Sequence, residues 1–147
     1  MPGIVVGVDG SEGSKHALAW AAEEARLRHA PLAVVLAWQL PATFDTGAAW
    51  VHMSSEVIDD VRKLAQQRLD DVCSELASLL EGVDVDRRVV EGATAPALIE
   101  AAENADLLVV GTRGHGGFAG LLLGSVSQQC AHHSPCPIVI IPPRPNA

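Results

Sequence analysis

The sequence predicts an α/β domain with a five-stranded, mainly parallel sheet and four helices packed on both of its faces. Short apolar runs alternate along the chain with longer stretches whose apolar residues recur at helical spacing. This alternation is typical of the strand–helix–strand units that build parallel sheets. The chain has 147 residues and a hydrophobic share of 48%, which suits one domain with a real core. We therefore expect a single domain over residues 1–147.

The first predicted strand, Gly3–Asp9, is a β-branched run that ends in turn residues, as expected for a buried strand. Residues 11–30 follow with alanines and leucines spaced along one helical face, and either Ser11 or Asp9 is placed to cap this helix. Pro31–Trp38 is again apolar and predicts the second strand.

The middle of the chain begins with its least patterned segment, Gln39–Ser55, which we interpret as a long loop of the kind that often serves function. From about Ser55 apolar residues return at helical spacing, with charged residues between them, until Gly82 ends the predicted helix. Val83–Gly92 alternates apolar and polar residues, which predicts a half-exposed strand near a sheet edge.

The last third of the chain supplies two more strands and two more helices. Residues 94–105 predict a short helix with Thr94 as its cap and Pro96 in the first turn. Asp106–Gly111 is wholly apolar between its first aspartate and its final glycine and predicts a central strand. A final helix is expected over Ser125–His133, and Pro137–Pro143 predicts the fifth strand.

Composition limits the partners and the compartment. The net charge of −8 comes from 18 acidic and 10 basic side chains, which argues against broad binding to nucleic acid or anionic membranes. An odd number of cysteines, 3, without a CxxC pair fits reduced cytosolic thiols. The amino terminus lacks the pattern of a signal peptide, so we expect a cytoplasmic protein.

The stretch GTRGHGGFAGLLLGS, residues 111–125, is the strongest candidate for a functional site. Ligands of open parallel sheets bind beside the carboxyl ends of the strands, where the strand order reverses. Gly111 ends a central strand and Gly114 follows it, while Gly124 and Ser125 precede the last helix. Bare backbone at a helix amino terminus favours an anion such as a phosphate.

Other readings of these residues stay open. Glycines at a strand–helix junction often serve only the turn, and this spacing is neither G-x-G-x-x-G nor a P-loop, since no lysine follows Gly124. Ser125 could donate its hydroxyl to a phosphate, or cap the helix in an S-x-x-Q box with Gln128. Arg113 and His115 could supply positive charge or simply point to water.

These motifs resemble the universal stress protein family over nearly the whole chain. The resemblance rests on the opening VVGVDGSEGS, the closing SPCPIVIIP, and the pattern G-x2-G-x9-G-[ST] of the family's ATP-binding subgroup. It implies a Rossmann-like fold of the adenine nucleotide alpha hydrolase type, a sheet order of 3-2-1-4-5, and a nucleotide lying across strands 1 and 4.

The resemblance also implies a role for individual residues. Asp9 would meet the ribose or a metal-bound phosphate, and the backbone of Ala37 would contact adenine. Gly111 would lie near the ribose, and the phosphates would be held by Gly114, Gly124, Ser125 and Val126. Val110 stands where the family often has a larger residue, which could loosen packing on the base. Without the resemblance, Asp9 reads equally well as a turn residue.

The function we expect is that of an ATP-binding regulatory protein of stress resistance, with ATP, alone or together with Mg²⁺, as its ligand and with little or no turnover. Alternatives are a sensor of AMP or cyclic AMP, a nucleotide-free adaptor, and a flavin protein, which the aromatic content of 3% disfavours. His132 and His133 lie near Cys130 and Cys136, but their spacing does not favour a metal site. No catalytic residue is evident, since a G-x-S-x-G elbow is lacking.

The last predicted strand, Pro137–Pro143, raises the question of self-association. An apolar strand at the edge of a sheet invites pairing with another copy, unless a loop of its own chain covers it. The family resemblance points to a homodimer formed through this strand. A downstream protein partner is not indicated by any motif.

Overall fold

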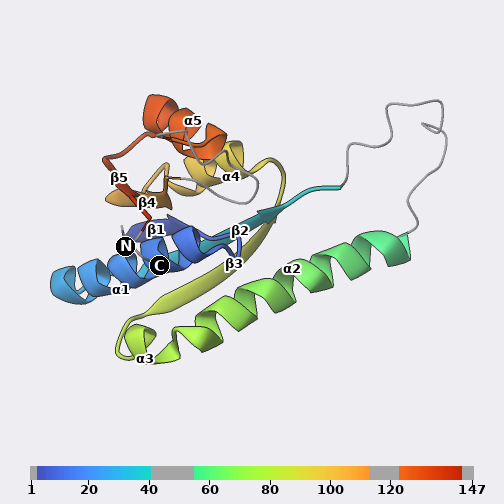
Figure 1. Cartoon of the computed structure of the whole chain (residues 1–147), viewed down its shortest axis with the longest axis horizontal. Coiled ribbons are helices and arrows are strands. Elements are labelled where there is room, and N and C mark those ends of the chain that lie inside the picture. Colours follow the sequence, from blue (N-terminus) through green and yellow to red (C-terminus); the bar gives the residue numbers. More distant parts are fainter. Residues whose placement is uncertain (1–2, 41–54, 113–122, 144–147) are drawn as a thin grey trace.

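The fold is a three-layer α/β sandwich in which helices cover both faces of one sheet (Figure 1). The computed structural model describes residues 3–40, 55–112 and 123–143. Its sheet has the order β3-β2-β1-β4-β5, and every neighbouring pair of strands is parallel. The predicted fold class and strand order are therefore confirmed.

The elements follow the predicted sequence of strands and helices closely. The strands are β1 (Ile4–Gly7), β2 (Leu32–Trp38), β3 (Val85–Glu91), β4 (Leu107–Gly111) and β5 (Ile138–Ile141). The helices are α1 (Glu12–Arg28), α2 (Ser55–Glu75), α3 (Ala77–Leu80), α4 (Thr94–Ala101) and α5 (Ser125–His133). No helix in these described ranges is long and apolar enough to span a membrane.

Two separate cores form because successive side chains of a strand point to opposite faces of the sheet. Val6 of β1 points into the core beneath α1 and α2, together with Val34 and Val109. Its neighbour Val5 points into the other core, which includes residues of α4 and α5. The aromatic-poor composition is thus accommodated by many small and branched aliphatic side chains in two thin layers.

Two local expectations were wrong, and each concerns where a helix begins or ends. The helix expected to run to Gly82 is interrupted at Leu76, so that α3 is a separate short helix after α2. Thr94 is the first helical residue of α4, and the cap position is taken by Ala93, which has no capping side chain. Ser11, by contrast, caps α1 as predicted and accepts from the Ser14 N–H.

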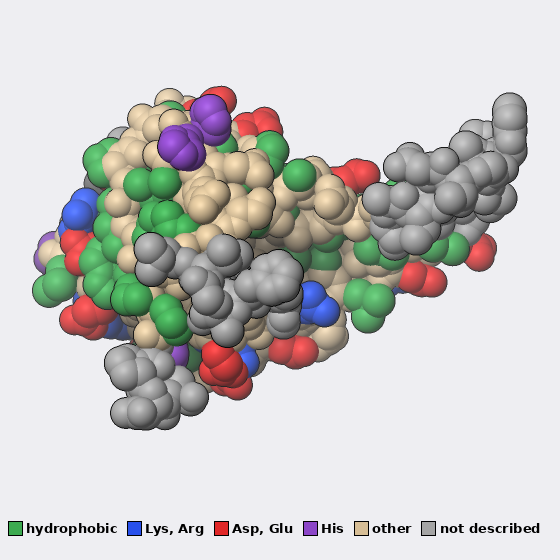
Figure 2. Space-filling model, turned by 45° about the horizontal axis from the view of Figure 1, so that its top comes forward, with side chains coloured by type: hydrophobic (Ala, Val, Ile, Leu, Met, Phe, Trp, Pro, Cys, Tyr) green, Lys and Arg blue, Asp and Glu red, His purple; other side chains and the backbone are tan. Residues whose placement is uncertain are grey.

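The two edge strands of the sheet differ in chemistry. β3 carries charged, exposed residues in its middle and is half-exposed as predicted, with Arg87 paired to Asp70 at 3.1 Å. β5 is entirely aliphatic, and each of its four residues is only partly buried. Hydrophobic side chains gather on the side of the molecule where β5 lies (Figure 2). β5 thus has the apolar, accessible edge that the sequence predicts.

Candidate functional site

The sheet register brings two of the predicted site residues, Asp9 and Ala37, to one edge, level with the residue after Gly111. Gly7 of β1 pairs with Val35 of β2, and Val6 pairs with Val109 of β4. Continuing each parallel register by two or three residues places Asp9 level with Ala37 and with Thr112. The carboxyl ends of β1, β2 and β4 therefore form a continuous ledge, at the position where the connections of an open parallel sheet leave room for a ligand.

Asp9 begins a turn whose polar groups bond to one another. Its carboxylate accepts from the Ser11 N–H at 2.8 Å, and its own N–H donates to the Ser14 hydroxyl at 3.2 Å. The Ser14 hydroxyl in turn donates to the Ser11 carbonyl at 3.0 Å. The structure therefore shows the turn role of Asp9, which fixes the direction of its carboxylate at the edge of the sheet.

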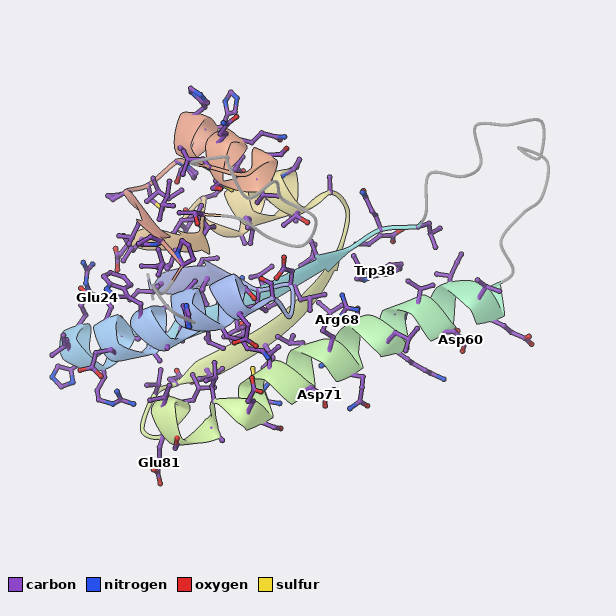
Figure 3. All side chains as sticks on the ribbon, in the orientation of Figure 1. Glu24, Trp38, Asp60, Arg68, Asp71 and Glu81 are labelled. Atoms are coloured by element: carbon purple, nitrogen blue, oxygen red, sulfur yellow. The ribbon has the colours of Figure 1, made fainter. Side chains whose placement is uncertain are left out.

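Gly10, in the same turn, is packed against a side chain that the sequence did not single out. Its φ of 88° is a left-handed conformation that favours glycine, and a Cβ there would lie 3.2 Å from Cδ of Arg68. Arg68 reaches this turn from α2, on the side of the helix that faces the sheet (Figure 3). It borders a cleft of about 400 Å³ together with Lys15, whose pKa is raised by hydrogen bonds from its ammonium group to Glu75 and Glu12.

Ala37 offers main-chain groups at the end of β2. The Leu32 N–H donates to Asp84 at 2.8 Å, and the Trp38 carbonyl accepts from Gly92 at 2.7 Å, so even-numbered residues of β2 bond toward β3. Odd-numbered residues point the other way, toward β1. Because β1 ends first, no group in the described ranges bonds to the N–H or carbonyl of Ala37.

Gly111 is explained by packing within the protein. A Cβ at this position would lie 3.1 Å from the carbonyl oxygen of Gly13 in the first turn of α1. The glycine therefore allows α1 to approach the end of β4 closely. This contact joins the turn after β1 to the segment after β4, a link that the sequence pattern alone did not indicate.

A pair of hydrogen bonds on one carbonyl holds the beginning of α5 against the end of β4. The carbonyl of Thr112 accepts from the Gly124 N–H at 2.6 Å and from the Ser127 hydroxyl at 2.6 Å. Ser127 is buried, and sequence analysis missed it because a serine in the first turn of a helix usually reads as a local cap. The pair fixes the direction in which α5 starts.

The first turn of α5 leaves backbone donors available. Gly124 occupies the cap position with extended backbone and no capping side chain. No described residue accepts a hydrogen bond from the N–H groups of Ser125, Val126 or Ser127. A helix amino terminus also carries about half a positive charge, so these three donors form a site suited to an anion.

The side chains in this turn have structural roles that correct one prediction. Ser125 does not cap α5 in an S-x-x-Q box, since its hydroxyl accepts from the side-chain amide of Gln129 at 3.3 Å. Val126 packs its side chain against the core beside α4 and α5, so it can offer a ligand only its backbone. The remaining predicted phosphate residue, Gly114, lies outside the described residues, as do Arg113 and His115.

The cysteine and histidine side chains near α5 are not gathered into a cluster in the part of the chain that the structure describes. Burial raises the pKa of Cys130 to about 11, and burial also raises the pKa of Cys73, so both thiols are protonated at neutral pH. The rings of His132 and His133 are 6.3 Å apart. The described ranges contain no cluster of three or more side chains suited to a metal ion.

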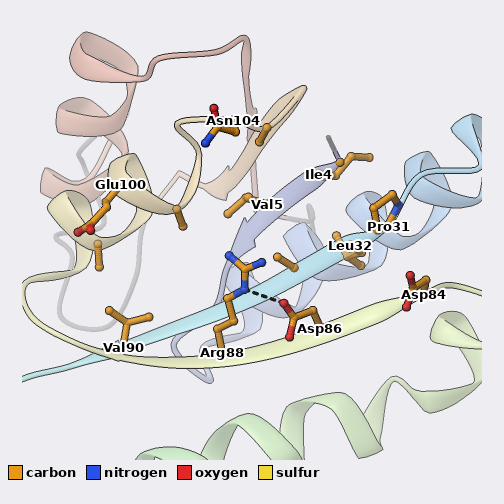
Figure 4. Close-up of a pocket in the computed structure, with 15 residues that line it drawn as sticks. Ile4, Val5, Pro31, Leu32, Asp84, Asp86, Arg88, Val90, Glu100 and Asn104 are labelled. Atoms are coloured by element: carbon orange, nitrogen blue, oxygen red, sulfur yellow. Dashed lines mark hydrogen bonds and ion pairs between the residues drawn. The ribbon is translucent and has the colours of Figure 1, made fainter. Parts of the chain in front are cut away.

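A second cleft, of about 730 Å³, lies at the opposite ends of the strands (Figure 4). Its floor includes Val5 and Leu32, and its rim carries Glu100 and Asp86, which pairs with Arg88 at 2.7 Å. The amino-terminal halves of β1 and β2 line this cleft, so it is separate from the ledge at their carboxyl ends.

Comparison with known proteins now places the chain. The profile of the universal stress protein family matches residues 2–142. The chain belongs to the universal stress protein family. One relative, a universal stress protein of Mycobacterium tuberculosis, is 35% identical over 95% of the chain and 47% of its own length. This chain therefore spans about half the length of the first curated relatives it matches, whereas it covers 96% of a Thermus aquaticus family member at 32% identity.

Solved structures of the family share the fold. A universal stress protein in complex with cAMP is 32% identical, with a TM-score of 0.61 over 95% of each chain. A family member from Archaeoglobus fulgidus in complex with dAMP is 28% identical, with a TM-score of 0.63 over 96% of this chain and 98% of that one. Both relatives are thus adenine nucleotide complexes of the same fold.

Proposed function

We propose that this universal stress protein binds an adenine nucleotide on the ledge formed by the carboxyl ends of β1, β2 and β4. ATP, accompanied by Mg²⁺, is the ligand we favour, and the protein acts as a nucleotide-responsive regulator of stress resistance with little or no turnover. The anionic tail lies on the first turn of α5, beside the bare backbone of Gly124, and is held by the N–H groups of Ser125 and Val126. Gly114 completes the phosphate site in this proposal.

The observation that carries the proposal is the uncapped amino terminus of α5. The Gly124 N–H already donates to Thr112, which orients the turn, while the next three N–H groups have no acceptor in the described part of the chain. An unsatisfied buried or ligand-facing donor is unfavourable, and a phosphate oxygen would satisfy it with a charge-assisted hydrogen bond. Ser125 can add its hydroxyl to the same phosphate.

The other end of the nucleotide is assigned to the ends of β1 and β2. The N–H and carbonyl of Ala37 together form a donor and acceptor pair that suits the edge of adenine. Asp9 is held by its turn with its carboxylate beside the ledge, where it would accept from a ribose hydroxyl or support Mg²⁺ on the phosphates. Gly111 lies between these positions and the phosphate site.

A second candidate is a sensor of AMP or cyclic AMP. The observation that favours it is the relative solved with cAMP, which is 32% identical to this chain, together with the dAMP complex of another relative. Three backbone donors at one helix end hold a single phosphate as readily as the last phosphate of a longer tail. Competition of ATP, ADP, AMP, cAMP and adenosine for one site separates the two candidates.

The decisive experiment measures ATP binding at equilibrium by Gly124→Val and Ala93→Val proteins. Gly124 has extended backbone that valine can adopt, so the substitution adds bulk beside the phosphate donors without strain at φ. Ala93 is the matched control, because it holds the cap position of α4 with similar backbone angles. We expect Gly124→Val to weaken ATP binding by about tenfold or more, a loss of about 1.4 kcal/mol.

Equal affinity of the two variants for ATP would contradict the phosphate site. Absence of ATP binding by the unmodified protein, under conditions where adenosine also fails to bind, would contradict the proposed function as a whole. Preference for cAMP or AMP over ATP would support the second candidate instead.

We also propose that the protein is a homodimer through β5 and acts in the cytoplasm. β5 is aliphatic and half-exposed, and edge strands of this kind pair with another copy unless something blocks them. Cys73, Cys130 and Cys136 are free thiols, which is typical of proteins from reducing compartments. Sedimentation of an Ile140→Lys variant tests the dimer, since a charge at this edge opposes pairing.

A further inference from the structure

The cleft at the amino-terminal ends of the strands has an apolar floor made of small side chains (Figure 4). Val5 and Ala33 pair in register on neighbouring strands and are 4% and 8% exposed. Ala97 and Ala101 of α4 line the same cleft at the spacing of one helical turn. The volume of about 730 Å³ lies within the range of about 300–1,000 Å³ that is typical of small-molecule sites.

Two residues of β3 bring opposite charges to this cleft. Asp86 pairs in register with Ala33, so it lies on the face of the sheet that carries the floor, and Arg88 follows two residues later on the same face. The Arg88 Nε–H donates to a carboxylate oxygen of Asp86 at 2.7 Å. Figure 4 shows both side chains pointing from β3 into the cleft.

The bond between these two side chains uses only part of what each can offer. In the ranges that the structure describes, nothing bonds to the terminal nitrogens of the Arg88 guanidinium or to the second carboxylate oxygen of Asp86. The pair therefore presents a planar group of N–H donors and a carboxylate acceptor side by side. Arg88 is 47% exposed and Asp86 is 60% exposed, so a ligand in the cleft can reach both.

This pair differs from the ion pair on the opposite face of the same strand. Arg87 bonds to Asp70 at 3.1 Å and so joins β3 to α2. Asp86 and Arg88 both belong to β3, so their bond joins no two elements, and an exposed pair of this kind contributes little to stability. A role in holding the fold together therefore does not account for their placement beside the cleft.

We propose that the cleft binds a free α-amino acid with an apolar side chain. The carboxylate of the ligand accepts from the terminal N–H groups of Arg88, and its ammonium group donates to Asp86. Its side chain lies on the floor at Val5 and Ala33. Both charged groups of an α-amino acid are attached to one carbon atom, so they match a guanidinium and a carboxylate that are held 2.7 Å apart.

The charges around the cleft favour this zwitterion over an ion of one sign. Asp84 and Glu100 also line the cleft, and no described residue forms an ion pair with either. Together with Asp86 they repel a carboxylate that has no ammonium group beside it. An amine without a carboxylate, in turn, leaves the terminal donors of Arg88 without a charge-assisted hydrogen bond. The apolar floor favours apolar amino acids over polar ones.

This site is separate from the proposed nucleotide site. The cleft lies at the amino-terminal ends of β1 and β2, whereas the ledge lies at their carboxyl ends. The inference goes beyond the proposed function and stands if that proposal fails, because the two sites share no residue.

The first test is a nuclear magnetic resonance titration of the unmodified protein with leucine, followed at the backbone N–H groups of Val5 and Ala33. Isocaproate is leucine without its ammonium group, isoamylamine is leucine without its carboxylate, and glycine lacks the apolar side chain. We expect saturable shifts with leucine, and dissociation constants at least about tenfold higher for the other compounds. The N–H resonances of Ser125 and Val126 should stay in place, which separates this site from the nucleotide site.

Substitutions on β3 test which side chains hold the ligand. Arg88→Gln should raise the dissociation constant of leucine by about tenfold. Arg87→Gln is the matched control, because the neighbouring arginine points to the other face of the sheet, and it should leave leucine binding unchanged. Asp86→Asn should weaken the binding of leucine and strengthen that of isocaproate, since it removes the carboxylate that repels an anion. A merely structural role of Asp86 would not separate the two ligands.

Three results would overturn the proposal. One is the absence of saturable shifts at Val5 and Ala33 during titration with leucine. Another is an affinity for isoamylamine or isocaproate that equals or exceeds the affinity for leucine. The third is an equal effect of Arg88→Gln and Arg87→Gln on leucine binding. The spectrum of each variant shows directly that the fold is retained.

Discussion

The turn after β1 and the junction after β4 both lead into a helix at the same edge of the sheet. The two helices differ in whether a side chain caps the amino terminus. After β1, Ser11 caps α1 through the Ser14 N–H, and Asp9 accepts from the Ser11 N–H. After β4, the cap position of α5 is Gly124, which has no side chain to donate or accept. In the described part of the chain, a side chain caps the start of α1, and none caps the start of α5.

The difference separates a helix start with a structural role from one that we propose binds a ligand. A side-chain cap contributes about 1 kcal/mol to a helix, so its absence at α5 forgoes stability that a serine or aspartate would supply. Position alone does not explain this, because both helices begin at carboxyl ends of adjacent strands. We interpret the uncapped start of α5 as the proposed phosphate site. We interpret the capped start of α1 as a structural segment that borders this site.

The largest expected effect is at the contact that joins the two segments. Gly111→Ala places a Cβ about 3.1 Å from the Gly13 carbonyl oxygen, a backbone atom that cannot turn away. We expect a loss of about 1–3 kcal/mol in the free energy of unfolding, as for other overpacked sites. Urea unfolding measures it. An unfolding free energy equal to that of the unmodified protein would show that α1 is not held against β4 as closely as described.

The next effect distinguishes the two helix starts directly. Ser11→Ala removes the cap of α1 and should lower the free energy of unfolding by about 1 kcal/mol. Ser125→Ala is the matched change at α5, where the hydroxyl only accepts from Gln129 and caps nothing, so we expect a loss below about 0.5 kcal/mol. Both are read from urea unfolding curves. Equal losses would remove the contrast between the two starts.

The smallest expected effect on stability comes from giving α5 a cap. Gly124→Asp supplies an acceptor for the first-turn N–H groups and should stabilise the protein by a few tenths of a kcal/mol, about the difference between glycine and the better caps. The same carboxylate would occupy the proposed phosphate site and repel the phosphate of a nucleotide. Thermal unfolding with and without ATP measures both effects. We expect the Gly124→Asp variant to have a slightly higher Tm than the unmodified protein when ATP is absent. Adding ATP should raise the Tm of the variant by less than it raises that of the unmodified protein.

The order of elements could be predicted from the sequence because it rests on apolar periodicity, which is a property of many residues together. The bounds of α5, Ser125–His133, agree with the prediction, and the edge position of Val85–Glu91 followed from its alternation. The caps at Thr94 and Ser125 were wrong because a shift of one residue in the helix start changes which side chain can reach the first turn.

The candidate site was predictable only in part. The glycine spacing identified the junction before α5, but the contact of Gly111 with Gly13 and the bond from Ser127 to Thr112 join segments distant in sequence. Such contacts leave no local pattern, since one depends on the distance between two elements and the other on a single hydroxyl. Arg68 beside Gly10 was missed for the same reason, because its charge resembles that of any exposed helical residue.

The most direct test of the central claim follows the backbone N–H resonances of Ser125, Val126 and Ser127 by nuclear magnetic resonance during titration. ATP should shift all three strongly, since a phosphate oxygen accepting a hydrogen bond changes the environment of the donor, whereas adenosine should shift them little. Binding of ATP that perturbs other parts of the ledge and leaves these three resonances in place would contradict the account.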